Sequence, residues 1–396
     1  MAAAIYMDHN ATTPVDERVF AAMRPYFTQM FGNAASRGHS FGWDAETAVD
    51  KARQQVAALL NGRPDAIVWT SGATESNNLA IKGVARANDH RGRHIITQVT
   101  EHKAILDTCK RLETQGFEIT RLPVDRFGRI DLDELRGAIR PDTILVSIMW
   151  ANNEIGTIQE IRAIGQICRE HGVLFHTDAT QAVAKVPIDI EADCIDLLSM
   201  SGHKMYGPKG CGCLYVRNKP RKVELMPIID GGGHERGYRS GTLNVTGIVG
   251  VGAACEIAAR EMAGEISRLR SLRDRLQSGI LEKLNGVHVN GYEPNRLPHV
   301  TNLSFENVDH DLLLGALPNV ALSTGSACTS ASLEPSYVLT ATGLQDDLAF
   351  SSLRFSLGKR NTIQEVDAVI DQVSQAIRTL RGGSPGCTSG AAGGPR

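Results

Sequence analysis

The sequence lacks a strong excess of charge, because 42 Lys and Arg residues nearly balance 44 Asp and Glu residues, for a net charge of -2. Without a basic field over the whole molecule, we expect neither nucleic acid nor a membrane as a partner. No window is apolar over the length that spans a bilayer. The first residues carry no basic stretch followed by an apolar core, so no signal peptide is expected.

The sequence also lacks a disulfide pattern, because its eight cysteines are scattered over 396 residues. This scatter indicates reduced thiols and a cytoplasmic protein. Cys211 and Cys213 alternate in a strand-like run without a second Cys or His pair at zinc-site spacing, so we expect core thiols. The glycine motifs of dinucleotide-binding and P-loop proteins are missing as well, which removes the main support for those two classes.

What the sequence does contain is a regular alternation of short apolar runs and helix-like segments. Strand-like runs are expected at 67–70, 94–99, 116–122, 143–149, 173–176 and 194–198. This alternation predicts an α/β fold with a mostly parallel sheet, of about seven strands, flanked by helices. Ligands of such sheets bind beyond the carboxyl ends of the strands. The polar residues that follow these runs are Thr74, His102, Asn153, Asp178 and Lys204.

The length of the chain predicts two domains. We expect an N-terminal segment at 1–15 that packs with the smaller domain, and a large domain at 16–259 that holds the site. A smaller α+β domain is expected at 260–381, after a long helix-like segment that connects the two. The last residues, 382–396, are rich in Gly, Ser and Ala and are expected to be a disordered tail.

Lys204 lies in the run SGHKMYGPKG at 201–210, directly after a strand-like run. Burial there disfavours the charged amine, and a neutral lysine amine can form a Schiff base with an aldehyde cofactor. Asp178 ends a buried strand, where its charge needs a partner such as the N–H of a pyridinium ring. A solvated loop lysine and a helix N-cap are the plainer explanations of each residue alone. Together they favour pyridoxal phosphate, with His102 able to cover one face of the ring.

The segment Ser71-Gly72-Ala73-Thr74 combines a strand end, a glycine turn and a helix start. Free N–H groups and hydroxyls at such a place can hold a phosphate. Taken alone, this signal is weak, because an ordinary helix N-cap is the plainer explanation of Ser71 and Thr74.

Five motifs in combination closely resemble the cysteine desulfurases of the NifS/IscS type, which are pyridoxal-phosphate enzymes of fold type I. The motifs are DATQ at 178–181, SGHK at 201–204, GGGHERG at 231–237, RSGT at 239–242 and GSACTS at 325–330. The resemblance extends from about Ile5 to about Arg381 and leaves out only the C-terminal tail.

The resemblance implies a role for each matching residue. The residues that it places around the cofactor ring are Lys204 as the covalent link, Asp178 on the ring nitrogen, Gln181 on the ring hydroxyl and His102 stacked on the ring. The residues that it places around the phosphate are Ala73, Thr74, Ser201, His203 and, from the other subunit of a homodimer, Thr242. Asn153, which also lies against the cofactor, and Arg354 hold the substrate. A guanidinium fork suits the carboxylate of an amino acid.

Cys328 lies in a loop of small residues at 323–332, where an exposed thiol can serve as a nucleophile. The resemblance implies that the Cys328 thiolate takes the sulfur of L-cysteine, leaving L-alanine and a Cys328 persulfide, while His102 carries the proton. It also implies an iron–sulfur scaffold protein and other sulfur acceptors as partners. Cys328 is expected to ligate metal only transiently, at a cluster on that scaffold.

Three other functions stay open on the sequence: a selenocysteine lyase, a pyridoxal-phosphate aminotransferase and a scaffold protein without chemistry. The short tail and the segments at 150–154 and 175–178 resemble the nitrogen-fixation branch of the desulfurases. The sequence leaves open whether the sulfur serves nitrogenase maturation or general iron–sulfur assembly.

Overall fold

The computed structural model describes residues 4–324 and 334–383, and its centre is a seven-stranded sheet. The strand order is β2-β8-β7-β6-β5-β3-β4. The strands are β2 (Ile67–Thr70), β3 (His94–Gln98), β4 (Glu118–Leu122), β5 (Thr143–Ser147), β6 (Leu174–Asp178), β7 (Leu197–Ser201) and β8 (Gly212–Val216). Neighbours pair in parallel except for β8, which is antiparallel to both β2 and β7. The predicted mostly parallel sheet is therefore confirmed.

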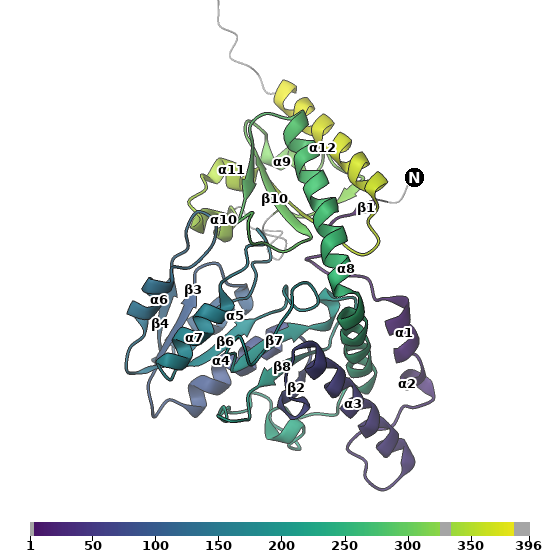
Figure 1. The fold of residues 1–396 in the computed structure, drawn as a ribbon, viewed down its shortest axis with the longest axis vertical. Coiled ribbons are helices and arrows are strands. Elements are labelled where there is room, and N and C mark those ends of the chain that lie inside the picture. The colour runs from purple at the N-terminus through teal and green to yellow at the C-terminus, as the bar shows by residue number, and fades with distance from the viewer. Residues whose placement is uncertain (1–3, 325–333, 384–396) are drawn as a thin grey trace, which may run out of the picture.

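Helices cover both faces of this sheet (Figure 1). Successive side chains of a strand point to opposite faces, and β2 shows the result. Trp69 packs into one core with Val56, whereas Val68 packs into another with Leu79. The helices are α1 (Glu17–Met23), α2 (Pro25–Thr28), α3 (Ser40–Leu59), α4 (Ala73–Ala87), α5 (Lys103–Glu113), α6 (Leu132–Ala138) and α7 (Ile161–Glu170). In the described part of the chain, no helix is both long and apolar enough to cross a membrane.

A smaller sheet of three antiparallel strands lies beyond the large one, in the order β12-β10-β9. The strands of this sheet and the helices of the same part of the molecule are β9 (Val287–Asn290), β10 (Val300–Phe305), α9 (His310–Leu313), α10 (Tyr337–Ala341), α11 (Asp346–Phe350), β12 (Ser352–Ser356) and α12 (Ile363–Gly383). The N-terminal strand β1 (Ile5–Tyr6) pairs in parallel with β11 (Val320–Ala321), and Met7 packs into the core of this part. The domain boundaries stay predictions, although α12 extends to Gly383, beyond the predicted start of the tail.

The helix α8 (Val245–Lys283) is 39 residues long and belongs to both parts of the molecule. Its first half packs into the core of the large sheet through residues such as Ile248 and Val251. Its second half packs into the core of the small sheet through Leu272 and Leu276. The expected boundary at residue 259 thus falls inside one continuous helix (Figure 1).

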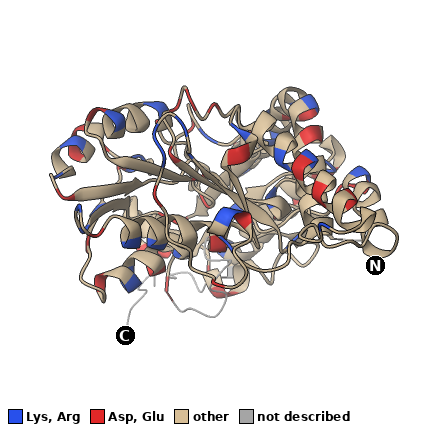
Figure 2. Cartoon of the chain, turned by 90° about the horizontal axis from the view of Figure 1, so that it is seen from below, with Lys and Arg blue, Asp and Glu red and all other residues tan. Residues whose placement is uncertain are grey.

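Acidic and basic residues are interspersed along the helices (Figure 2). This distribution agrees with the net charge of -2.

Candidate active site

A cavity of about 610 Å³ lies at the carboxyl ends of the strands of the large sheet. The loops that follow β2, β3, β5, β6 and β7 all contribute to its wall, because the carboxyl ends of parallel strands meet at one edge. The predicted site residues that line it are Ala73, Thr74, His102, Asn153, Asp178, Gln181, Ser201, His203, Lys204 and Arg354. The structure therefore brings together residues that the sequence spreads over nearly 300 positions.

The N-terminus of α4 forms one end of the cavity, directly after β2. Its N-cap is Gly72, at φ 149°, so no side chain caps the first turn. Only a glycine permits the close approach of β8 here, because a Cβ added to Gly212 would lie 2.8 Å from the Gly72 Cα. Uncapped N–H groups and the positive end of the helix dipole favour an anion such as a phosphate.

Ser201 and His203 lie beside this helix terminus. The His203 Nδ1 lies 3.1 Å from the Thr12 Oγ1. Burial, and after it the nearby Lys204, lower the pKa of His203 to about 4. The imidazole is therefore neutral at pH 7, and it can donate a hydrogen bond to a phosphate without adding charge.

Asp178 is 5% exposed and is held in one orientation at the base of the cavity. Its Oδ2 accepts a hydrogen bond from the Asn77 Nδ2 at 2.7 Å, and its Oδ1 accepts one from the Thr180 N–H at 2.9 Å. Each carboxylate oxygen can accept a second bond. Asp178 can therefore still receive an N–H from a ligand.

The residues in the cavity wall include several buried polar atoms without a protein partner. Among the described residues these atoms are the Asn153 Oδ1, the Thr180 Oγ1 and the Arg354 Nε. Native proteins rarely leave such atoms unsatisfied, so the cavity is shaped for a polar ligand. With an amine in Lys204, a carboxylate in Asp178 and an anion site at α4, the wall fits the aldehyde, ring nitrogen and phosphate of pyridoxal phosphate.

Arg354 reaches the cavity from β12 of the small sheet. Its side chain is 3% exposed and pairs with the Asp8 carboxylate at 2.7 Å through Nη2. Nη1 donates to the backbone oxygen of Asn153 at 3.0 Å. These contacts fix the guanidinium beside Asn153, where the two predicted substrate residues meet.

Asn10 joins these residues. Sequence reasoning did not identify it, because the polar loop at 8–14 suggested a site without indicating which of its residues contributes. Asn10 is 1% exposed, and its backbone oxygen accepts hydrogen bonds from the Lys204 Nζ and from the Gln181 Nε2. Its Nδ2 donates to the backbone oxygen of Asn153 at 3.0 Å, and its Oδ1 lies 2.8 Å from the His299 Nε2. Asn10 thus connects the cofactor side of the cavity to the substrate side.

Two buried carboxyl groups next to the site were also missed, although each follows or precedes a predicted residue. Glu101 precedes His102 and is 0% exposed, and burial raises its pKa well above the usual range. Glu154 follows Asn153, and burial raises its pKa to about 7.

Both residues hold the start of α10 against the large sheet. Ser336 donates to the Glu154 carboxyl at 2.5 Å, and the Tyr337 hydroxyl donates to the Glu101 backbone oxygen at 2.6 Å.

One described residue among the predicted site residues, Thr242, does not lie at the cavity. It is exposed, and its predicted role requires a second subunit, so that role stays a prediction. Cys328 lies outside the described residues, as does Cys387. The described cysteines are all free and buried, namely Cys109, Cys168, Cys194, Cys211, Cys213 and Cys255.

Comparison with known proteins matches nearly the whole chain. The family model of the class V aminotransferases covers residues 5–369. Cysteine desulfurase IscS of Anaeromyxobacter dehalogenans is 55% identical over 381 residues, which are 96% of this chain and 94% of that protein. A solved NifS-like protein superposes with a TM-score of 0.89 at 39% identity, over 95% of this chain and all of that one. SspA, solved in complex with cysteine, gives a TM-score of 0.79 at 39% identity, over 89% of this chain and 98% of that one.

Both the sequence and the fold are similar to these relatives over nearly the whole chain. The chain belongs to the class V aminotransferase family and, within it, to the IscS-type cysteine desulfurases.

Proposed function

We propose that this cysteine desulfurase holds pyridoxal phosphate through Lys204 and moves the sulfur of L-cysteine to Cys328. The observation that carries the proposal is the single cavity in which Lys204, Asp178 and Arg354 meet. An amine, a ring-nitrogen partner and a carboxylate clamp in one cavity suit a cofactor-bound amino acid. When bound, the cofactor withdraws electrons from the Cα of that amino acid.

Arg354 and Asn153 bind and orient the substrate. The Arg354 guanidinium offers its unpartnered Nε toward a carboxylate, and the Asn153 Oδ1 accepts a hydrogen bond from the bound ligand. Asp178 keeps its orientation through Asn77 and Thr180 while the ring nitrogen donates to it. The residues therefore place the substrate before any bond changes.

Lys204 and His102 move protons. The Lys204 amine, once released by the incoming substrate, takes the proton from the Cα. The His102 Nδ1 accepts a hydrogen bond from the Ala104 N–H at 3.1 Å, so the neutral ring carries its proton on Nε2. His102 therefore delivers or receives a proton at Nε2.

The Cys328 thiolate attacks the substrate sulfur. An S–S bond forms and the C–S bond breaks, its electron pair staying on the substrate carbon, which takes up a proton. The products are L-alanine and a persulfide on Cys328, which passes its terminal sulfur to an iron–sulfur scaffold protein or another acceptor. The free cysteines fit the reducing cytoplasm as the place of this chemistry, and Thr242 completes the phosphate site across a homodimer.

The test is incubation of the yellow, cofactor-loaded protein with L-cysteine and a thiol reductant, with alanine and sulfide measured in parallel. Cys328→Ser is expected to lower both products by ~10³-fold, because no other nucleophile replaces the thiolate. Cys387→Ser, in the C-terminal tail, is the matched control and keeps the wild-type rate.

Other outcomes would overturn the proposal. Wild-type rates in Cys328→Ser would exclude the thiolate step, and a keto acid in place of alanine would indicate an aminotransferase. Turnover of selenocysteine but not cysteine would indicate a lyase. A protein that stays colourless with pyridoxal phosphate would indicate a scaffold without chemistry.

A further inference from the structure

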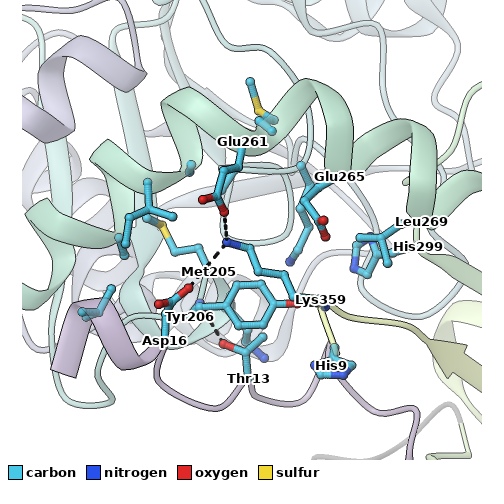
Figure 3. Close-up of a pocket in the computed structure, with 18 of the residues that line it drawn as sticks. His9, Thr13, Asp16, Met205, Tyr206, Glu261, Glu265, Leu269, His299 and Lys359 are labelled. Atoms are coloured by element: carbon cyan, nitrogen blue, oxygen red, sulfur yellow. Dashed lines mark hydrogen bonds and ion pairs between the residues drawn. The ribbon is translucent and has the colours of Figure 1, made fainter. Parts of the chain in front are cut away.

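A second cavity lies beside α8, and residues of the N-terminal segment and Lys359 also line it (Figure 3). We call it the rear cavity, and we call the cavity at the strand ends the front cavity. Of the described residues, Lys204 alone lines both cavities. The rear cavity has a volume of about 40 Å³, which is room for a few water molecules but not for a substrate. The rear cavity is therefore too small to bind a substrate, but the residues in its wall can influence Lys204.

The rear cavity contains a second lysine, Lys185, which is connected to Lys204 by hydrogen bonds. The Lys185 Nζ donates to the Gln181 Oε1 at 3.3 Å. The Gln181 Nε2 donates at 3.0 Å to the Asn10 backbone oxygen, which also accepts from the Lys204 Nζ. Lys185 thus fixes the amide of the residue that we place on the ring hydroxyl.

Two buried imidazoles, those of His9 and His299, also line the rear cavity. His9 and His299 are 4% and 1% exposed, and the Nδ1 of each is buried without a partner among the described residues. His299 uses its Nε2 on the Asn10 Oδ1, so its Nδ1 is an acceptor. Burial, followed by Lys185, lowers the pKa of His9 to about 4 and that of His299 well below its usual range. Both rings are therefore neutral at pH 7.

The other charged groups in the wall of the rear cavity, apart from Lys204, have ion-pair partners. Lys359 bridges Glu261 at 2.9 Å and Asp16 at 3.8 Å, as Figure 3 shows. Glu265 pairs with Arg268 at 3.0 Å. Lys185 has no ion-pair partner in the part of the chain that the structure describes. Its charge is therefore not cancelled locally.

We propose that Lys185 is a positioning residue that sets the charge of the Lys204 nitrogen from the rear cavity. Burial, and then the charge of Lys204, lower the pKa of Lys185 to about 7. Repulsion between two amines is mutual, so a protonated Lys185 disfavours a proton on the Lys204 nitrogen by the same amount. Lys185 thereby keeps Lys204 able to accept the substrate's proton at neutral pH. This inference rests on the proposed link between Lys204 and the cofactor.

The test is a pH titration of the visible absorbance of the holoenzyme, which reports the protonation of the Lys204-linked nitrogen. Lys185→Met removes the repulsion, so the midpoint is expected to rise by roughly one pH unit. The acid limb of the kcat/KM profile should move in the same direction. Lys185→Arg keeps a permanent charge, so its midpoint should lie at or below that of the wild type.

The matched control is Lys51→Met, which removes the same charge from an exposed residue that lines neither cavity. Solvent screens that charge, so its shift should stay below about 0.3 pH unit. The inference fails if Lys185→Met leaves the midpoint unchanged, or if both Lys185 variants raise it equally, which would indicate packing alone. If Lys185→Met does not fold, a raised midpoint in Lys185→Arg would overturn the inference by itself. Missing absorbance would instead contradict the proposed function.

Discussion

The two sheets contribute to the active site in opposite ways. The seven-stranded sheet brings a polar loop to the cavity at the end of each of five strands, so its topology alone assembles the cofactor side. The three-stranded sheet contributes Arg354 from within β12, and that side chain reaches the cavity through contacts with Asp8 and Asn153. The cofactor side of the site thus depends on the topology of the large sheet, whereas the substrate side depends on a few contacts of one side chain. Substitutions at the contacts between the sheets should therefore be the most informative.

Among substitutions at the contacts between the sheets, the largest effect is expected for Arg354→Ala. Loss of the guanidinium removes the carboxylate clamp and leaves the Asp8 carboxylate without its partner. We expect kcat/KM for L-cysteine to fall ~100-fold, mostly through KM, which corresponds to the loss of about 3 kcal/mol of binding. Steady-state kinetics measures the change. Arg360→Ala, an exposed arginine six residues away, is the control with unchanged kinetics; an unaltered KM in Arg354→Ala would refute the clamp.

A smaller, pH-dependent effect is expected for Glu154→Gln. Burial raises the pKa of Glu154 to about 7 in the folded protein. Its contribution to stability is therefore complete below about pH 4 and is lost as the pH rises through about 7. Glutamine does not ionise, so the free energy of unfolding of the variant should not fall in this way. Between about pH 4 and pH 7 the variant should therefore become more stable relative to the wild type, by on the order of 2 kcal/mol.

Urea unfolding at pH 5 and pH 8 measures this effect. A difference between Glu154→Gln and the wild type that is the same at both pH values would contradict the buried, titrating carboxyl. An opposite sign would show that an ionised Glu154 holds Ser336 better than a neutral one.

The smallest effect is expected for Tyr337→Phe, which removes the hydroxyl that donates to the backbone oxygen of Glu101. The ring stays in place over Lys103, whose Nζ lies 4.4 Å from its centroid. We expect a loss of about 1 kcal/mol in the free energy of unfolding, the usual worth of one such hydrogen bond. Chemical unfolding monitored by circular dichroism measures it, and a loss above about 3 kcal/mol would show that α10 depends on more than this bond.

The parts of the site that the sequence predicted are those that follow directly from strand ends. Lys204 and Asp178 stand out because a charged group after a buried strand needs a chemical reason. Asn10 and Lys185 carry no such local sign, since their partners lie far away in the chain or act through a neighbour. Arg354 came only from the resemblance, because a charged residue inside a strand looks the same whether it faces solvent or a substrate.

For the fold, the sequence predicted the mostly parallel sheet but not the direction of every strand. Alternating patterns specify the parallel strands, because buried strands and covering helices differ in period and length. They do not specify that β8 inserts antiparallel between β2 and β7, since a strand's direction leaves no trace in its composition.

The continuous helix α8 has a mechanical consequence. At 39 residues it is a rod of about 58 Å that is anchored in two hydrophobic cores. Its segment in one core ends at Ile257 and its segment in the other begins at Leu269, so residues near 260 form the rigid link between the two cores. Large rotations between the halves would require bending the rod. The two halves of the active site are therefore set at a fixed spacing when α8 forms.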